Sequence, residues 1–127
     1  MTSMFINILF LLPNLNQQTD SSILKDILEI CGTLKENERL VLSSKYDCTF
    51  CRDGVYQYVE NTGEKFKYKI IFLGDMKDFP SEHLGLLKDV YFTNKFQLFS
   101  AITQKYKIEK FPIIFDIKAD ELTLIKI

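Results

Sequence analysis

The chain has 127 residues, of which 46% are hydrophobic and 26% are charged, as is usual for a globular protein with one sizeable core. It carries 16 Lys and Arg against 17 Asp and Glu, so the formal net charge is −1, and no block of like charges occurs. This balance provides no electrostatic footprint for nucleic acid, and we expect no nucleic-acid partner. We predict a single domain over residues 1–127.

Residues 1–19 are the least typical part of the chain. Their apolar run at 4–12 (MFINILFLL) is too short to span a bilayer as a helix, which takes about 20 residues. No Lys or Arg precedes this run, and no clear small-residue cleavage site follows it, although an export signal needs both. We interpret residues 1–19 as an N-terminal extension with a strand at 4–12, and a remnant export signal is the alternative.

From residue 20 onward the sequence alternates between two hydrophobic periodicities. Three segments repeat apolar residues every three or four positions, as an amphipathic helix does. Short β-branched and aromatic runs between them are typical of buried strands. The stretch 79–87 is ambiguous, because a helix start at Pro80–His83 is followed by only one short turn. In chain order we predict helix 20–31 with Gly32 as its C-cap, strand 39–44, helix 48–61, strand 66–73, short strand 90–92, helix 94–105, and strands 111–117 and 122–127 joined by a turn at 118–121.

This order of elements predicts a layered α/β fold with a central mixed sheet and helices on its faces. Strands that alternate with helices favour parallel neighbours in the sheet. The last two strands are separated by a short turn, so we expect a C-terminal antiparallel β-hairpin.

Cys48 and Cys51 stand three positions apart, directly after a predicted strand and at the start of a predicted helix. The N-terminus of a helix supplies partial positive charge and free backbone N–H groups, which favour a thiolate over a thiol. A second thiol one turn further on can resolve a mixed disulfide. Asp47 would raise the pKa of Cys48, while Lys45 and Arg52 would lower it, and the sign of the sum stays open. The pair is a candidate redox dithiol.

A zinc site is the weaker alternative for the same two cysteines. Structural zinc takes four ligands, and Cys31 and His83 are the remaining Cys and His residues of the chain. We expect Cys31 to be a buried small residue on an apolar helix face, and His83 to lie on the surface. We therefore expect no metal and no other cofactor.

The pair Phe111-Pro112 opens the predicted strand 111–117. Proline has no backbone N–H, so it is tolerated at the first residue of a strand and not within the ladder. A cis bond before it would cost little and would form a tight turn there.

From Asp20 to Ile127 the chain resembles the thioredoxin-like superfamily. The matching segments are the strand RLVLSS, the CTFC pair that follows it, the strand YKIIFL, and YKIEKFPIIFDI with its hairpin. The resemblance implies a three-layer thioredoxin-like fold in which Pro112 follows a cis bond and packs against the CxxC sulfurs. The chain is also similar to bacterial exported or membrane-linked members of this superfamily, which carry an extra segment before the cis-proline strand; here this segment would be 76–95. Those relatives favour a periplasmic or membrane-associated location over a cytoplasmic one.

The resemblance further implies a thiol-disulfide oxidoreductase, with Cys48 as the nucleophile and Cys51 as the resolving thiol. Its partners would be a protein thiol or disulfide as substrate and an external electron donor or acceptor. The residues that would contact the substrate are Phe111, Pro112, Thr49, Phe50 and Tyr46.

The chain departs from the family pattern in several places. Tyr46-Asp47 stands where a Trp usually precedes the first Cys, and Thr49-Phe50 replaces Gly-Pro between the cysteines. The buried acid expected near Leu42 or Ser43 is missing, and no helix follows the last predicted strand. These departures keep a second hypothesis open, a non-catalytic docking module with a static or idle Cys pair. An uncovered sheet face or edge would also allow a homodimer.

Overall fold

The computed structural model describes residues 20–118 and 121–125, so the predicted strand at 4–12 lies outside the described residues. Every helix and strand predicted between 20 and 118 is present, with ends that differ by at most two residues. Within these ranges no helix combines the length and apolar character needed to cross a membrane. The elements are α2 (Asp20–Cys31), β1 (Glu38–Ser44), α3 (Thr49–Asn61), β2 (Lys67–Leu73), η2 (Met76–Asp78), η3 (Ser81–Asp89), β3 (Val90–Thr93), α4 (Phe96–Tyr106), β4 (Ile113–Lys118) and β5 (Glu121–Ile125).

The five strands form one mixed sheet in the order β3-β2-β1-β4-β5. β1, β2 and β3 run parallel, whereas β4 is antiparallel to β1 and β5 is antiparallel to β4. In this register Leu42 of β1 lies between Ile71 of β2 and Ile113 of β4. The predicted α/β fold with a mixed sheet and a C-terminal hairpin is confirmed. The carboxyl ends of β1, β2 and β3 therefore meet at one edge of the sheet.

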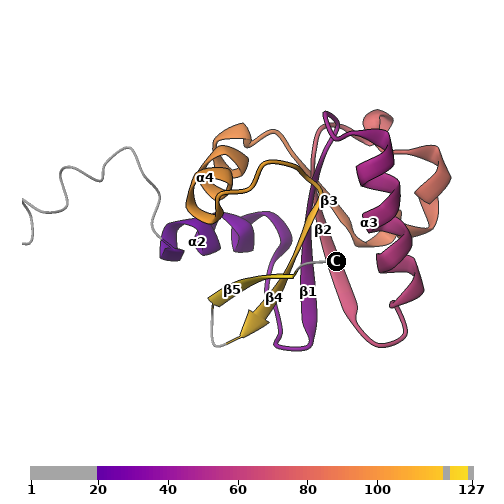
Figure 1. Ribbon diagram of the computed structural model, residues 1–127. Coiled ribbons are helices and arrows are strands. Elements are labelled where there is room, and N and C mark those ends of the chain that lie inside the picture. Colours follow the sequence, from indigo (N-terminus) through magenta and orange to yellow (C-terminus); the bar gives the residue numbers. More distant parts are fainter. Residues whose placement is uncertain (1–19, 119–120, 126–127) are drawn as a thin grey trace, which may run out of the picture.

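Helices cover both faces of the sheet, with α2 and α4 on one face and α3 on the other (Figure 1). β1 and β2 are apolar at successive positions because each of their faces is covered. The core between the sheet and the helices α2 and α4 is formed by the buried residues Ile23, Ile27, Cys31, Leu40, Leu42, Ile71, Leu73, Leu98, Phe99, Ile102, Ile108, Ile113, Phe115 and Ile117. The core on the side of α3 is formed by the buried residues Val41, Tyr56, Val59, Tyr68, Ile70, Phe72, Phe79 and Ile114.

The ambiguous stretch 79–87 forms 3-10 turns that pack against α3. η3 has a kink at His83, where φ is −123° and ψ is 30°. The prediction that His83 lies on the surface is wrong, because the side chain is buried. Its Nδ1 lies 3.1 Å from Glu60 Oε1 and its Nε2 lies 3.1 Å from Asp53 Oδ1. A polar ring can be buried here because both of its nitrogens have partners.

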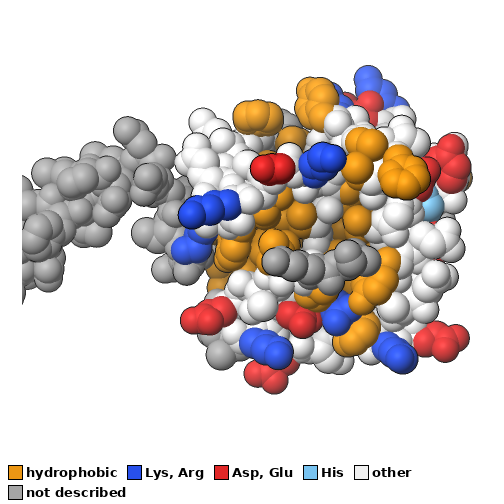
Figure 2. All heavy atoms as spheres, viewed as in Figure 1, with side chains coloured by type: hydrophobic (Ala, Val, Ile, Leu, Met, Phe, Trp, Pro, Cys, Tyr) orange, Lys and Arg blue, Asp and Glu red, His pale blue; other side chains and the backbone are white. Residues whose placement is uncertain are grey.

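β5 is the outer strand of the sheet and pairs with β4 alone among the described strands. Its apolar side chains Leu122, Leu124 and Ile125 are partly buried. Apolar side chains gather over the middle of the face shown in Figure 2, in the region of the β4–β5 hairpin. A homodimer through this face or edge stays a prediction.

Candidate dithiol site

Cys48 occupies the N-cap position of α3, directly after the loop that follows β1. The residue has φ −60° and ψ 132°, and its Sγ accepts a hydrogen bond from the backbone N–H of Cys51 over 3.5 Å. The first turn of a helix leaves such N–H groups without a partner inside the helix, so the sulfur takes the place of a capping oxygen. Both cysteines are free thiols; Cys48 is exposed and Cys51 is half-buried.

The two thiols differ in acidity because the hydrogen bonding around them stabilises the Cys48 thiolate and not the Cys51 thiolate. The backbone N–H of Cys51 lowers the pKa of Cys48 most, followed by the thiol of Cys51, the N–H of Phe50 and the charge of Lys110. The pKa of Cys51 is raised, first because its thiol donates to Cys48 and then because of its burial. The sequence leaves open whether the pKa of Cys48 is raised or lowered. The structure gives a lowered pKa for Cys48, which is the more exposed thiol.

Asp47 points into the protein rather than toward the sulfurs. Its Oδ2 accepts hydrogen bonds from the hydroxyl of Ser43, at 2.7 Å, and from the backbone N–H of Ser44, at 2.9 Å. The Tyr56 hydroxyl donates to Ser43 Oγ over 2.7 Å. Burial raises the pKa of Asp47, and the hydrogen bonds from Ser44 and Ser43 oppose this. Asp47 is thus a half-buried acid in the loop after β1, held against Ser43 and Ser44.

The cations expected from the sequence to act on Cys48 are engaged elsewhere. Arg52 Nε lies 3.5 Å from Asp53 Oδ1, and Lys45 Nζ lies 5.3 Å from the centre of the Tyr46 ring. The cation that lowers the pKa of both sulfurs is Lys110, which is exposed and stands just before Phe111-Pro112. Sequence reasoning missed Lys110 because the pairing of β4 with β1 brings it to the site.

Replacement of Lys110 by glutamine is expected to raise the pKa of Cys48, because it removes a positive charge near the thiolate. At a pH below that pKa, alkylation of Cys48 by iodoacetamide should slow by about twofold, since water screens an exposed charge strongly. The measurement is the alkylation rate between pH 5 and 9, followed by mass. Lys45→Gln is the matched control and should leave the profile in place. An unchanged profile in Lys110→Gln would contradict this account of the site.

A hollow of about 600 Å³, here called the thiol pocket, lies beside Cys48. Two rings from distant segments, Phe99 of α4 and Phe111, approach each other there with centroids 5.2 Å apart. Thus α4 and the segment before β4 together build the wall opposite the thiol. The thiol pocket is lined by Ser44, Tyr46, Asp47, Cys48, Leu73, Phe96, Phe99, Ser100, Thr103, Gln104, Glu109, Lys110 and Phe111.

The residues expected to contact a substrate fall into two groups. Tyr46 and Phe111 line the thiol pocket together with Cys48. Pro112 follows a cis peptide bond and is buried behind Phe111, and it is not among the lining residues. Thr49 and Phe50 are exposed at the start of α3, outside the thiol pocket; the side chain of Phe50 is 88% exposed.

Sequence analysis did not identify the contribution of α4 to the site. Phe96, Phe99 and Thr103 of this helix line the thiol pocket. The apolar spacing of 94–105 predicts that Phe96 faces inward together with Leu98, Phe99 and Ile102. For Phe96 this prediction is wrong, because the residue is 64% exposed. The helix begins at Phe96, so this side chain stands at the mouth of the site and not over the sheet.

The residues considered for a zinc site have other roles. Cys31 is the last residue of α2 and is buried, and burial raises the pKa of its thiol. Both ring nitrogens of His83 contact carboxylates. Over residues 20–118 and 121–125, no group of three or more Cys, His, Asp or Glu side chains could hold a metal ion.

Comparison with known proteins gives no relative from which a function could be transferred. No family model matches the chain, and no curated protein or solved structure matches it either. The function is therefore inferred from the geometry around Cys48.

Proposed function

We propose that the protein is a thiol-disulfide oxidoreductase of the thioredoxin-like class, with Cys48 as nucleophile and Cys51 as resolving thiol. One observation carries the proposal: the exposed sulfur of Cys48 caps α3 by accepting a hydrogen bond from the backbone N–H of Cys51, and hydrogen bonding with Cys51 and with the N–H of Phe50 lowers the pKa of Cys48. These bonds favour the thiolate, which is the reactive species in disulfide exchange.

Three further features support the thioredoxin-like class. The dithiol follows the central strand β1, and β1 lies between the parallel strand β2 and the antiparallel strand β4. Helices lie on both faces of the sheet (Figure 1). A cis-proline precedes β4 and follows Phe111, which lines the same pocket as Cys48.

The proposed reaction has two exchange steps. In the first, the Cys48 thiolate attacks one sulfur of a substrate disulfide, a mixed disulfide forms, and the other substrate sulfur leaves as a thiolate that takes a proton from water. In the second, Cys51 loses its proton and attacks the Cys48 sulfur of the mixed disulfide, which releases the second substrate thiolate. Two electrons pass to the substrate, and the Cys48–Cys51 disulfide is reduced again by an external dithiol. The reverse direction uses the same steps with a protein dithiol as donor.

The proposal is tested by equilibrating the protein in glutathione redox buffers, trapping free thiols by alkylation and measuring the mass of the Cys48–Cys51 peptide. We expect a two-electron transition with a potential above about −300 mV, because a stabilised thiolate favours the reduced form. A Cys31→Ala background removes the third thiol from the analysis. Two results would contradict the proposal: a pair that never closes, or a potential far below about −300 mV, which fits a structural disulfide and the docking module.

A further inference from the structure

We propose that Tyr46 and Phe96 are specificity-determining residues that select disulfide substrates with a large apolar side chain next to the reacting cysteine. This inference rests on the proposed function, because it describes how a substrate of Cys48 is chosen. It follows from the shape of the groove, the exposure of these two rings and the balance of charge around them.

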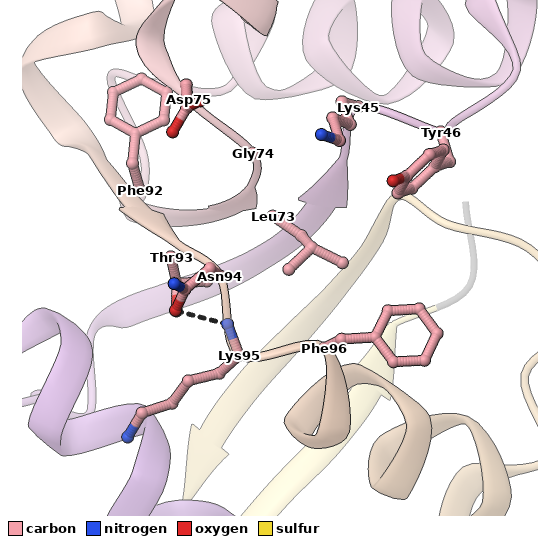
Figure 3. A pocket seen from close by; sticks show the side chains of 10 residues that line it. All are labelled: Lys45, Tyr46, Leu73, Gly74, Asp75, Phe92, Thr93, Asn94, Lys95 and Phe96. Carbon is pink, nitrogen blue, oxygen red and sulfur yellow. Dashed lines mark hydrogen bonds between the residues drawn. The ribbon is translucent and has the colours of Figure 1, made fainter.

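The groove consists of two joined hollows. Next to the thiol pocket lies a second hollow of about 700 Å³ at the carboxyl ends of β1, β2 and β3, here called the strand-end pocket (Figure 3). The two share three lining residues, Tyr46, Leu73 and Phe96, so they are continuous. In Figure 3 the side chain of Leu73 points toward the space between Tyr46 and Phe96. These three side chains therefore form the middle of a groove with Cys48 on one side.

Tyr46 and Phe96 are large side chains that the fold itself does not cover. Their exposed fractions are 73% and 64%, and both line the middle of the groove, where the two hollows join. Exposed apolar rings that gather at one site are typical of a binding surface. Behind them, Phe99 and Phe111 form an apolar wall. A substrate side chain placed here would be covered by aromatic rings on two sides.

The charges along the groove do not favour a strongly charged substrate. In the thiol pocket the charge of Lys110 is opposed by its neighbour Glu109 and by Asp47. In the strand-end pocket Lys45 is balanced by Asp75. The side chain of Lys95 extends away from the pocket, and its Nζ lies 3.2 Å from Glu29 Oε2 (Figure 3).

A small disulfide with several carboxylates would therefore find no matching set of cations in the groove, whereas an apolar side chain would gain buried area. The occupant that fits is an extended polypeptide with a bulky apolar residue beside its cysteine.

The length of a mixed disulfide decides which substrate residue can reach the thiol pocket. A disulfide holds the Cα atoms of its two cysteines about 5.5–6 Å apart, and the next residue of the substrate lies about 3.8 Å further on. That neighbour is the first substrate side chain able to enter the thiol pocket, because Cys48 itself lines it. The substrate residue next to the reacting cysteine is thus the one that Tyr46 and Phe96 would contact.

The test compares peptides that carry one cysteine in a mixed disulfide with a coloured thiol and differ only in having Phe or Ser beside that cysteine. The wild-type protein should release the coloured thiol about tenfold faster from the Phe peptide, since a partly buried phenyl group contributes roughly the free energy that gives one factor of ten. Phe96→Ser and Tyr46→Ser should each reduce the ratio of the Phe-peptide rate to the Ser-peptide rate toward one. Leu84→Ser is the matched control and should keep the ratio, because Leu84 is an exposed apolar side chain on η3 outside both pockets.

Equal rates with the two peptides in the wild-type protein would overturn the inference while leaving the proposed function standing. So would a preference that survives in both Phe96→Ser and Tyr46→Ser, or one that is lost in Leu84→Ser. Failure to react with either peptide would overturn the proposed function, and the subsite with it. Tyr46, Phe96 and Leu84 are all largely exposed, so the three variants should fold like the wild-type protein.

Discussion

Cys48→Ser is expected to abolish disulfide exchange, whereas Cys51→Ser is expected to stop the reaction after its first step. Cys48 is the exposed thiol with the lowered pKa, so it makes the first attack, and serine cannot replace it because its hydroxyl is not ionised near neutral pH. Without Cys51 the mixed disulfide has no resolving thiol. Incubation of Cys51→Ser with a disulfide peptide should therefore add one peptide mass per protein, while Cys48→Ser should show turnover no faster than the uncatalysed reaction.

The third thiol supplies a matched control for this pair. Cys31→Ala should keep both steps, because Cys31 is a buried residue at the end of α2 and lines neither part of the groove. Turnover that survives in Cys48→Ser would show that exchange does not depend on Cys48. A mixed disulfide that forms in Cys48→Ser and not in Cys51→Ser would reverse the assignment of nucleophile and resolving thiol.

Tyr56→Ala is expected to lower the free energy of unfolding by roughly 3–5 kcal/mol, as truncation of a fully buried aromatic side chain does. Tyr56 has no exposed surface, and its ring stacks on Phe79 with centroids 5.6 Å apart. The edge of the His83 ring meets it at a centroid distance of 5.1 Å. Because Tyr56 belongs to α3, its loss would loosen the helix that carries the dithiol. Urea unfolding followed by circular dichroism measures the change.

Tyr56→Phe separates the ring from its hydroxyl. This variant keeps the packing and removes the hydrogen bond to Ser43, so we expect a loss of about 1 kcal/mol. Tyr46→Ala is the control for a tyrosine outside the core, because most of its side chain is exposed, and its stability should stay near that of the wild type. If Tyr56→Ala cost no more than Tyr56→Phe, the packing between α3, η3 and the sheet would differ from the one described.

Much of the fold was predictable because its signals are local. Asp20–Cys31 and Phe96–Tyr106 show helical periodicity, and Gly32 caps α2 with φ 78° and an N–H bond to Leu28 O. The position of Cys48 at the start of α3 was also visible, since an apolar strand ends just before it. Such patterns extend over one helix or strand, and their hydrogen bonds form between residues close in sequence.

His83 shows where local patterns end. A lone histidine between two polar turns predicts a surface position, and the partners that the structure gives it, Asp53 and Glu60, are far from it in sequence. These two carboxylates lie on the face of α3 that η3 covers. The ring can be buried because each of its nitrogens lies within hydrogen-bond distance of one of them. The fold therefore decides the environment of His83.

By itself, the sequence of this protein determined the order of helices and strands and the placement of two thiols at a helix start. Only the tertiary structure decided which groups surround them. The pairing of β4 with β1 brings Lys110 and Phe111 to Cys48, and the packing of α4 brings Phe96 and Phe99. Asp47, although adjacent in sequence to Cys48, turns inward to Ser43. The physical reason is that charge and apolar contact act through space, whereas periodicity and capping act along the chain.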